Sequence, residues 1–385
     1  MLDFQYSLRT DVIFGKDMIT RLPEVLEEYG KKVLLVYGGK SIHRTGLYNV
    51  IMDQLKNFEV YELSGIQPNP KIDSVNEGCK ICKEKGIEVI LAVGGGSVLD
   101  ASKAIGIGAN YNGDCWDLIT QKSPITDCLP LVGVLTVAAS GSEVGNGAVI
   151  SNPATNQKIG IDYKDMIYRH IIMDPTYTMT LPKYQSACGA IDIFSHLIEQ
   201  YFTGEYTLLS KGLCEAVMKT IIEYAPVIIQ HPDNYEARAQ IMWSASLANN
   251  GILSNGSSYS GWPCHAIEHE LSAYYDITHG HGLAIVLPAW MEYVLNDTTV
   301  DQFARYARKV WDIQEEEDYK AARMGIQSTK KFFEDLGIST TLSSVNIPDD
   351  LFDQIAKEAQ INGYLDYAFV PLTKEDVVTI LNSCK

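Results

Sequence analysis

The chain has 385 residues, of which 46% are hydrophobic, and this length and composition predict a large buried core divided among two or three domains. Its formal net charge of −17 argues against nucleic acid and against an anionic membrane surface as partners. Because apolar runs stay shorter than the roughly 18 residues of a membrane-spanning helix, a signal-peptide pattern is lacking, and eight cysteines make no disulfide framework, we expect a cytoplasmic protein with reduced thiols.

Strands and helices alternate through the first half of the chain. Short apolar runs predict strands over 33–37, 58–63, 88–93 and 131–137. Helical spacing predicts helices over 47–57 and 72–85 and a third one ending near residue 107. This alternation is typical of a parallel sheet with helices on both faces, and it predicts a Rossmann-like α/β domain.

A glycine-rich loop follows the third predicted strand, with the sequence Gly94-Gly95-Gly96-Ser97. Glycines let the backbone approach a ligand closely, and the helix after them offers free N–H groups and the positive end of its dipole to a phosphate. The loop departs from the GxGxxG fingerprint, so a simple tight turn is the alternative interpretation. Gly39-Lys40-Ser41 resembles the end of a P-loop, but Leu34 stands where a P-loop needs glycine, and we reject an ATPase.

The second half of the chain has a different pattern. It begins after the proline- and threonine-containing segment 174–182, and its apolar residues recur at spacings of three and four. We therefore predict an α/β domain over 1–181 and an all-α domain over 182–385.

Four of the eight histidines gather between residues 262 and 288, and a fifth, His196, follows Asp192 by four residues. Helical spacing places Asp192 and His196 on one face of a helix, and it does the same for His265 and His269. Asp192, His196, His265 and His279 together offer one carboxylate and three imidazoles, a set that suits Zn²⁺ or Fe²⁺ better than Mg²⁺ or Ca²⁺. Isolated histidines are interpreted as ordinary surface or core residues, namely His43, His170 and His231.

These motifs together resemble the iron-containing, or group III, alcohol dehydrogenase family, and within it the butanol dehydrogenase branch. The resemblance covers nearly the whole chain and rests on seven stretches: YGGKSIHRTG (37–46), PNP (68–70), AVGGGSVLDASKAI (92–105), LTVAASGSEV (135–144), DPTYTMTLP (174–182), GAIDIFSHLIEQY (189–201) and HAIEHELSAYYDITHGHGLAIVLP (265–288). It implies that the α/β domain over 1–181 binds a dinucleotide, that the helical domain over 182–385 is the metal-binding, catalytic domain, and that the active site lies between them.

The resemblance also implies roles for single residues. Asp192, His196, His265 and His279 would bind the metal, while His269 would lie near the nicotinamide outside the metal ligands, and His281 is left unassigned. His269 and Asp100 are the expected catalytic side chains. The family often has Thr-Thr-x-x-Thr where this chain runs from Thr136 to Ser140 without the middle hydroxyl. The implied cofactor contacts are Gly38, Gly39, Ser41, Asn69, Gly94, Gly95, Gly96, Ser97, Asp100, Lys103, Thr136, Ser140 and Lys158.

The expected activity is that of a metal-dependent, NAD(P)H-linked alcohol dehydrogenase or aldehyde reductase. Tyr259, Trp262 and Ile267 near the ligands favour short aliphatic substrates such as butanol and butyraldehyde, with a polyol such as glycerol, or a lactaldehyde, as the alternative. A lyase resembling dehydroquinate synthase would need basic residues for an anionic substrate, and these are missing near the ligands. A metal-binding protein without catalysis would leave the glycine loop unexplained.

Cofactor preference depends on the end of the strand at 33–37. An acidic residue there would bind the ribose 2′-hydroxyl and repel a 2′-phosphate, but this chain has Gly38-Gly39-Lys40-Ser41. We therefore predict that NADPH is accepted and preferred over NADH. The resemblance further suggests one Fe²⁺ or Zn²⁺ ion and a homodimer.

Overall fold

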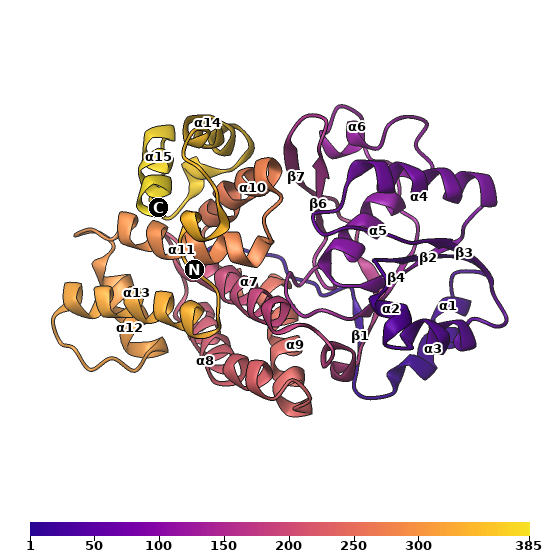
Figure 1. Cartoon of the computed structure of the whole chain (residues 1–385), viewed down its shortest axis with the longest axis horizontal. Helices are drawn as coiled ribbons and strands as arrows, with labels where there is room; N and C mark the ends of the chain where they lie inside the picture. Colours follow the sequence, from indigo (N-terminus) through magenta and orange to yellow (C-terminus); the bar gives the residue numbers. More distant parts are fainter. The chain divides into compact units, whose positions relative to one another are not determined.

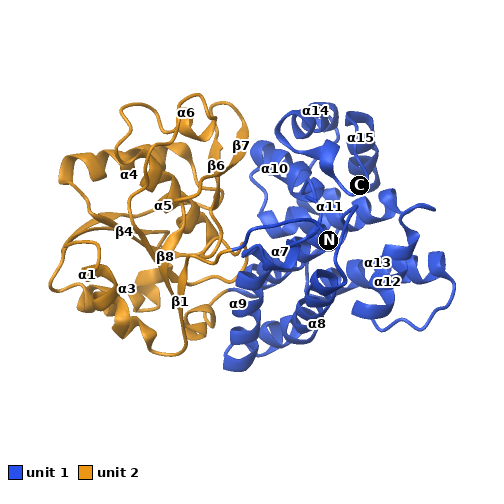
Figure 2. Ribbon diagram, turned by 180° about the vertical axis from the view of Figure 1, so that it is seen from behind, with its two compact units in different colours: residues 1–6, 182–385 blue, residues 7–181 orange.

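The computed structural model describes residues 1–385, which separate into two compact units (Figure 2). One unit is Ser7–Leu181, and the other is Pro182–Lys385 together with Met1–Tyr6. The first residues belong with the second unit, where the Leu2 amide donates a hydrogen bond to the Gly256 carbonyl over 2.9 Å. None of the helices combines the length and the hydropathy needed to cross a bilayer.

The Ser7–Leu181 unit contains a six-stranded sheet in the order β1-β8-β5-β4-β2-β3, in which every neighbouring pair is parallel (Figure 1). A separate antiparallel hairpin is formed by β6 and β7. The predicted α/β class is confirmed. The strands are β1 Asp11–Phe14, β2 Lys32–Tyr37, β3 Glu59–Leu63, β4 Val89–Gly94, β5 Leu131–Leu135, β6 Gly147–Asn152, β7 Gln157–Asp162 and β8 Tyr168–Met173.

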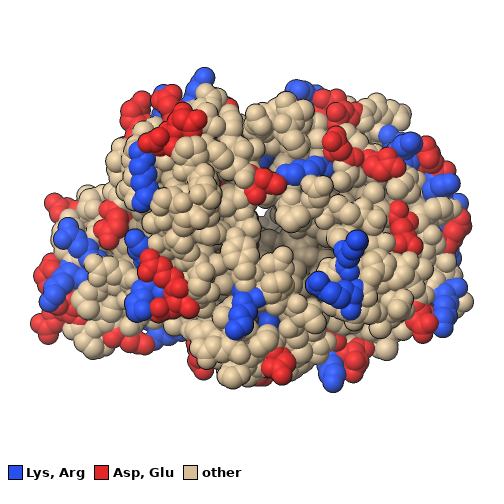
Figure 3. Space-filling view, in the orientation of Figure 1, with Lys and Arg blue, Asp and Glu red and all other residues tan.

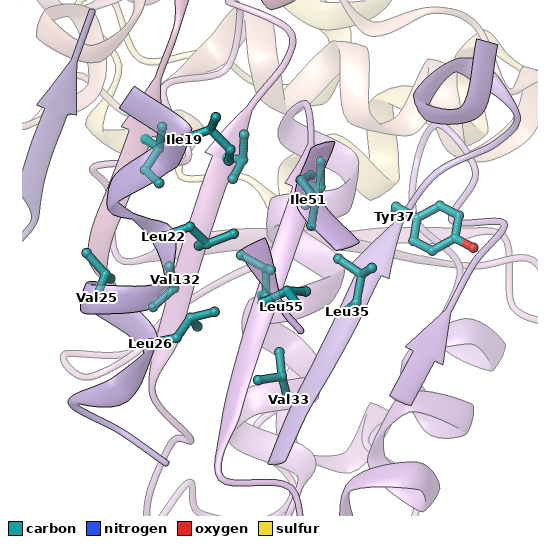
Figure 4. Packing of buried hydrophobic residues seen from close by; sticks show 14 of the residues in the cluster. Ile19, Leu22, Val25, Leu26, Val33, Leu35, Tyr37, Ile51, Leu55 and Val132 are labelled. Carbon is teal, nitrogen blue, oxygen red and sulfur yellow. The ribbon is translucent and has the colours of Figure 1, made fainter. Parts of the chain in front are cut away.

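Helices connect these strands, and the hydrophobic core lies between them and the sheet. On one face, Leu22, Leu26 and Ile51 pack against Val33 of β2 and Val132 of β5 (Figure 4). The central strands consist almost entirely of Val, Leu and Ile because a parallel sheet is buried on both faces. The helical segments of this unit are η1 Met18–Arg21, α1 Leu22–Glu27, α2 Ser41–Arg44, α3 Leu47–Gln54, α4 Ile72–Lys85, α5 Gly96–Gly108, α6 Trp116–Ile119 and η2 Pro175–Thr178.

The second unit is helical, as predicted, and α7 lies at its centre. Every residue of α7 from Ser186 to Tyr201 is buried, and the helix packs against α8, α9, α10 and α11. The helices are α7 Lys183–Tyr201, α8 Leu208–Gln230, α9 Tyr235–Asn249, α10 Pro263–Tyr275, α11 His279–Val294, α12 Val300–Val310, α13 Asp318–Asp335, α14 Phe352–Asn362 and α15 Lys374–Ser383, with short 3-10 segments η3 Ile252–Ser254, η4 Leu342–Val345 and η5 Leu365–Tyr367.

Charged side chains of both signs are intermixed on the face shown in Figure 3, and much of that face is uncharged. No continuous basic region is visible there.

Candidate functional site

Four side chains from three helices of the second unit converge on one point. Asp192 and His196 lie one turn apart on α7, His265 lies in the first turn of α10, and His279 is the first residue of α11. Asp192 Oδ1 lies 3.5 Å from Nε2 of His196, 3.5 Å from Nε2 of His279 and 3.8 Å from Nε2 of His265. The structure thus brings together all four residues that the sequence analysis assigned to a metal.

The geometry of this cluster fits a divalent transition-metal ion. Asp192 Oδ1 and His265 Nε2 are buried and have no hydrogen-bond partner, although a buried polar atom normally has one. Distances of 3.5–3.8 Å are long for hydrogen bonds, but they suit two ligands of one ion that contacts each at about 2.0–2.2 Å. Asp192, His265 and His279 offer ligand atoms that all lie within 4.8 Å of one another.

Two buried glutamates orient two of the imidazoles. Glu199 of α7 is hydrogen-bonded to Nδ1 of His265, and Glu268 of α10 is hydrogen-bonded to Nδ1 of His279, so that Nε2 of each ring points toward Asp192. Neither glutamate was predicted from the sequence. The spacing in the sequence could have indicated them, because Glu199 follows His196 and Glu268 follows His265 by three residues, so each glutamate lies on the same helix face as a histidine of the cluster.

The charges around the cluster stabilise a positive charge at its centre. Burial alone would raise the pKa of Asp192, but the imidazoles of His196, His279 and His265 hold it well below its ordinary value. Burial lowers the pKa of His196 to about 3, which leaves this ring neutral and able to bind a metal. Burial would also lower the pKa of His265, but the carboxylates of Glu199 and Asp192 raise it to about 10.

The start of α10 places His265 through an unusual local conformation. Trp262 precedes the helix with φ 48°, in the left-handed region, and Pro263 occupies the first helical turn. The Trp262 ring lies edge-on to two imidazoles of the cluster, 5.7 Å from His196 and 5.2 Å from His265 between ring centroids. An aromatic wall therefore covers one side of the cluster.

The two remaining histidines of this region lie in different surroundings. The ring of His269 lies 5.5 Å from that of His279 and 6.2 Å from that of His265, beside the cluster. His281 Nδ1 is instead hydrogen-bonded to the Tyr184 hydroxyl over 3.0 Å. The catalytic role of His269 stays a prediction.

The glycine loop in the Ser7–Leu181 unit joins β4 to α5, and close packing explains all three glycines. A Cβ at Gly94 would lie 2.5 Å from Val98, one at Gly95 would lie 2.7 Å from Val137, and one at Gly96 would lie 3.1 Å from Cβ of Ser140 and closer still to its hydroxyl. The Thr136 amide also donates to the Gly94 carbonyl over 2.9 Å. The predicted contacts Thr136 and Ser140 thus lie against the loop.

Asp100 and Lys103 of α5 hold the segment that follows Ser140. Asp100 accepts hydrogen bonds from the Ser142 hydroxyl over 2.6 Å and from the Val149 amide over 2.9 Å. Lys103 is fully buried and donates to the Ser142 hydroxyl and to the carbonyls of Gly145 and Gly147 over 2.7–3.0 Å. Burial lowers the pKa of Lys103 to about 8. Both residues position a loop, and their direct cofactor or catalytic roles stay predictions.

The other predicted cofactor residues fall into two groups in the same unit. Asn69 and Lys158 are buried near the β6–β7 hairpin, because Lys71 bridges to Ser151 and Ser151 pairs with Lys158. Gly38, Gly39 and Ser41 lie between the end of β2 and the start of α2, and Gly39 and Ser41 are exposed. Their contacts with a cofactor remain predicted.

Comparison with known proteins identifies relatives along the whole chain. Residues 9–175 match the family described as iron-containing alcohol dehydrogenase, and residues 186–384 match the C-terminal part of the Fe-containing alcohol dehydrogenase family. The chain is 47% identical to NADH-dependent butanol dehydrogenase A of Clostridium acetobutylicum over 99% of both chains, and 37% identical to the NADPH-dependent aldehyde reductase YqhD of Escherichia coli over 94% of both. The crystal structure of NADH-dependent butanol dehydrogenase A from Thermotoga maritima superposes with a TM-score of 0.95 at 38% identity, covering 99% of this chain and 98% of that one.

Proposed function

We propose, from the premise that this chain belongs to the iron-containing alcohol dehydrogenase family, that it is a metal-dependent, NAD(P)H-linked oxidoreductase interconverting short aliphatic aldehydes and primary alcohols. The observation that carries the proposal is the convergence of Asp192 Oδ1 with three histidine Nε2 atoms at 3.5–3.8 Å. The names of the butanol dehydrogenase and aldehyde reductase relatives support the substrate class.

In this proposal, each group of residues has a separate role. Asp192, His196, His265 and His279 would hold a divalent ion, which when bound would supply Lewis-acid polarisation of a substrate oxygen, and a bound nicotinamide would supply the hydride chemistry. His269, beside the ligands, transfers the proton that alcohol formation consumes. Asp100 acts on the reaction through the Ser142–Val149 segment that it holds, and the predicted contacts around Gly94–Ser97 bind the pyrophosphate at the start of α5.

An exposed cluster of tyrosines, close in sequence to Trp262, supports an apolar substrate tail. The rings of Tyr259, Tyr364 and Tyr367 lie 5.9–6.5 Å apart, and each is more than half exposed. Gly261 makes this possible, because a Cβ there would lie 2.7 Å from the Tyr364 carbonyl oxygen. Tyr259 lies three positions before Trp262, whose ring contacts the rings of His196 and His265. An alkyl chain fits such rings better than a polyol does, so glycerol and lactaldehyde remain the alternative.

Cofactor preference belongs to the same proposal. β2 ends without an acidic residue, and Lys40 and Ser41 are exposed at the start of α2, where they suit a 2′-phosphate. We propose that NADPH is preferred, although the names of the butanol dehydrogenase relatives specify NADH and that of the aldehyde reductase specifies NADPH. A homodimer and the identity of the ion as Fe²⁺ or Zn²⁺ also stay proposals.

One assay tests activity, metal dependence and cofactor preference together. Purified protein is stripped with a chelator, reloaded with Fe²⁺ or Zn²⁺, and assayed for butanal-dependent oxidation of NADPH and of NADH. We expect activity only after reloading, and a higher kcat/KM for NADPH because Lys40 attracts the extra phosphate. A stripped enzyme of undiminished activity would contradict the metal-dependent function.

A substitution of Lys40 tests the cofactor preference separately from the activity. Lys40→Glu places an acidic side chain where the dinucleotide ribose is expected, so the ratio of kcat/KM for NADPH to that for NADH should fall at least tenfold, on the order of 1.4 kcal/mol. A wild-type preference for NADH would show that the predicted NADPH preference is wrong and leave the oxidoreductase function intact.

A further inference from the structure

Glu199 joins α7 to the beginning of α10 through both of its carboxylate oxygens. One oxygen accepts a hydrogen bond from Nδ1 of His265, and the other accepts from the Cys264 amide over 2.7 Å and from the His265 amide over 3.4 Å. The side chain is completely buried. A carboxylate that caps the first turn of a helix is favourable, because the turn has unpaired amides and a positive dipole end.

Glu268 joins α10 to the beginning of α11 in a similar way. Its carboxylate accepts from Nδ1 of His279 and from the Ser272 hydroxyl, and its side chain is completely buried. Gly282 leaves the room for it, because a Cβ at position 282 would lie 2.6 Å from Cγ of Glu268. The Ser272 hydroxyl also lies 3.2 Å from the Ile277 carbonyl oxygen, so Ser272 links Glu268 to the turn that leads into His279.

The ring of His196 is not held by a carboxylate at Nδ1. Its Nδ1 is buried without a hydrogen-bond partner. Its ring is held by packing, stacked on His265 with 4.9 Å between ring centroids and edge-on to Trp262. The three imidazoles therefore differ, since two are held by buried carboxylates and one by its aromatic neighbours alone.

We infer that Glu199 and Glu268 are positioning residues that orient His265 and His279 for metal binding before the ion arrives. A carboxylate bonded to Nδ1–H keeps that proton in place, so the proton that metal binding displaces is the one on Nε2, and the carboxylate raises the electron density of Nε2. The ring directions agree with this role, because Nε2 of both histidines faces Asp192. The inference rests on the proposed metal-dependent function, but it concerns metal affinity rather than turnover.

The test measures Co²⁺ affinity of the chelator-stripped full-length protein by competition, and it uses the visible spectrum of bound Co²⁺ to report ligand geometry. Glu199→Gln and Glu268→Gln keep the side-chain volume but remove the charge. We expect each to weaken Co²⁺ binding about 10- to 100-fold and to alter the spectrum. Two variants on different helices keep the test meaningful if one of them fails to fold.

Glu215→Gln is the matched control. Glu215 is also a buried carboxylate of the helical unit, but it lies on α8 and bonds Tyr201 and Arg305. We expect this change to lower the melting temperature without changing Co²⁺ affinity. Folded Glu199→Gln and Glu268→Gln proteins that bind Co²⁺ as tightly as the wild type would overturn the inference, whereas a wild type that binds Co²⁺ but oxidises no NAD(P)H would overturn only the proposed function.

Discussion

At the scale of single residues, the cluster separates side chains that face its centre from side chains that lie beside it. Asp192 meets three Nε2 atoms, whereas His269 contacts the rings of His265 and His279 from the side. His269 also belongs to a second group of possible ligands with Glu268 and His279. Glu268, however, already accepts a hydrogen bond from Nδ1 of His279. Because Glu268 is occupied by this hydrogen bond, the second group of possible ligands is incomplete, which supports a proton-transfer role for His269 rather than a role as a metal ligand.

We therefore predict that His269→Ala lowers kcat for butanal reduction about 10²- to 10⁴-fold, the usual contribution of a proton-transferring group, and leaves the bound metal nearly unchanged. Elemental analysis and steady-state kinetics on the same preparation provide the measurement. Asp192→Ala is the comparison, since it removes the atom shared by the cluster and should abolish both metal binding and activity. Loss of metal from His269→Ala would show that the two roles are wrongly divided.

At the scale of elements, the site depends on how closely α11 approaches α7. Gly280, the residue after His279, lies directly against the Cys188 backbone, and a Cβ at position 280 would lie 2.7 Å from the Cys188 carbonyl carbon and closer to its oxygen. Cys188 is one helical turn before Asp192. The contact between the two helices therefore sets how far His279 lies from Asp192.

Gly280→Ala should lower the free energy of unfolding by about 1–3 kcal/mol, because the backbones must separate, even though alanine favours a helix by about 1 kcal/mol over glycine. It should also weaken metal binding. Gly212→Ala on α8 is the control, since a Cβ there meets nothing within 4 Å and should leave stability unchanged or slightly raised. Urea unfolding of both variants measures these changes in stability. Equal urea midpoints for Gly280→Ala and Gly212→Ala would contradict a close contact between the helices at Gly280.

At the scale of the whole molecule, the eight cysteines are free, and all except half-buried Cys128 are buried. Burial raises the pKa of Cys82, Cys128, Cys214 and Cys384 from an ordinary value of 9.0 to about 12. Between these values the unfolded thiols lose their protons while the folded ones keep them. Stability is then fully present below pH 9 and is lost as the pH rises toward 12, by about 1.4 kcal/mol per pH unit for each such thiol.

Two buried lysines have the opposite effect on stability, which they raise as the pH rises, and they do so over a lower pH range. Burial lowers the pKa of Lys103 to about 8 and that of Lys211 to about 7 from 10.5, so their contribution to stability grows until pH 10.5 and then stops. We expect urea midpoints measured at pH 9, 10.5 and 11.5 to fall most steeply above pH 10.5. Cys384→Ala should flatten that slope, and an unchanged slope would contradict the proposed cause.

Much of the fold could be predicted because the decisive patterns are local. The apolar runs that became β2, β3, β4 and β5 alternate with helical spacing, and they predicted a parallel α/β unit before a helical one. β1, β8 and the β6–β7 hairpin were not predicted. β1 has only four residues and β8 begins with Tyr-Arg-His, so the composition of neither strand shows that it joins the buried sheet.

By itself, the sequence determined which residues could form a metal site, because the Asp192–His196 and His265–His269 spacings are properties of single helices. Only the tertiary structure decided what supports that site. Glu199 lies 66 positions before His265, so its bond depends on how α7 and α10 pack. Lys103 likewise became a loop anchor through residues about 40 positions away. Periodicity reports neighbours within one element, whereas partners from distant segments are set by packing, which a single sequence does not display.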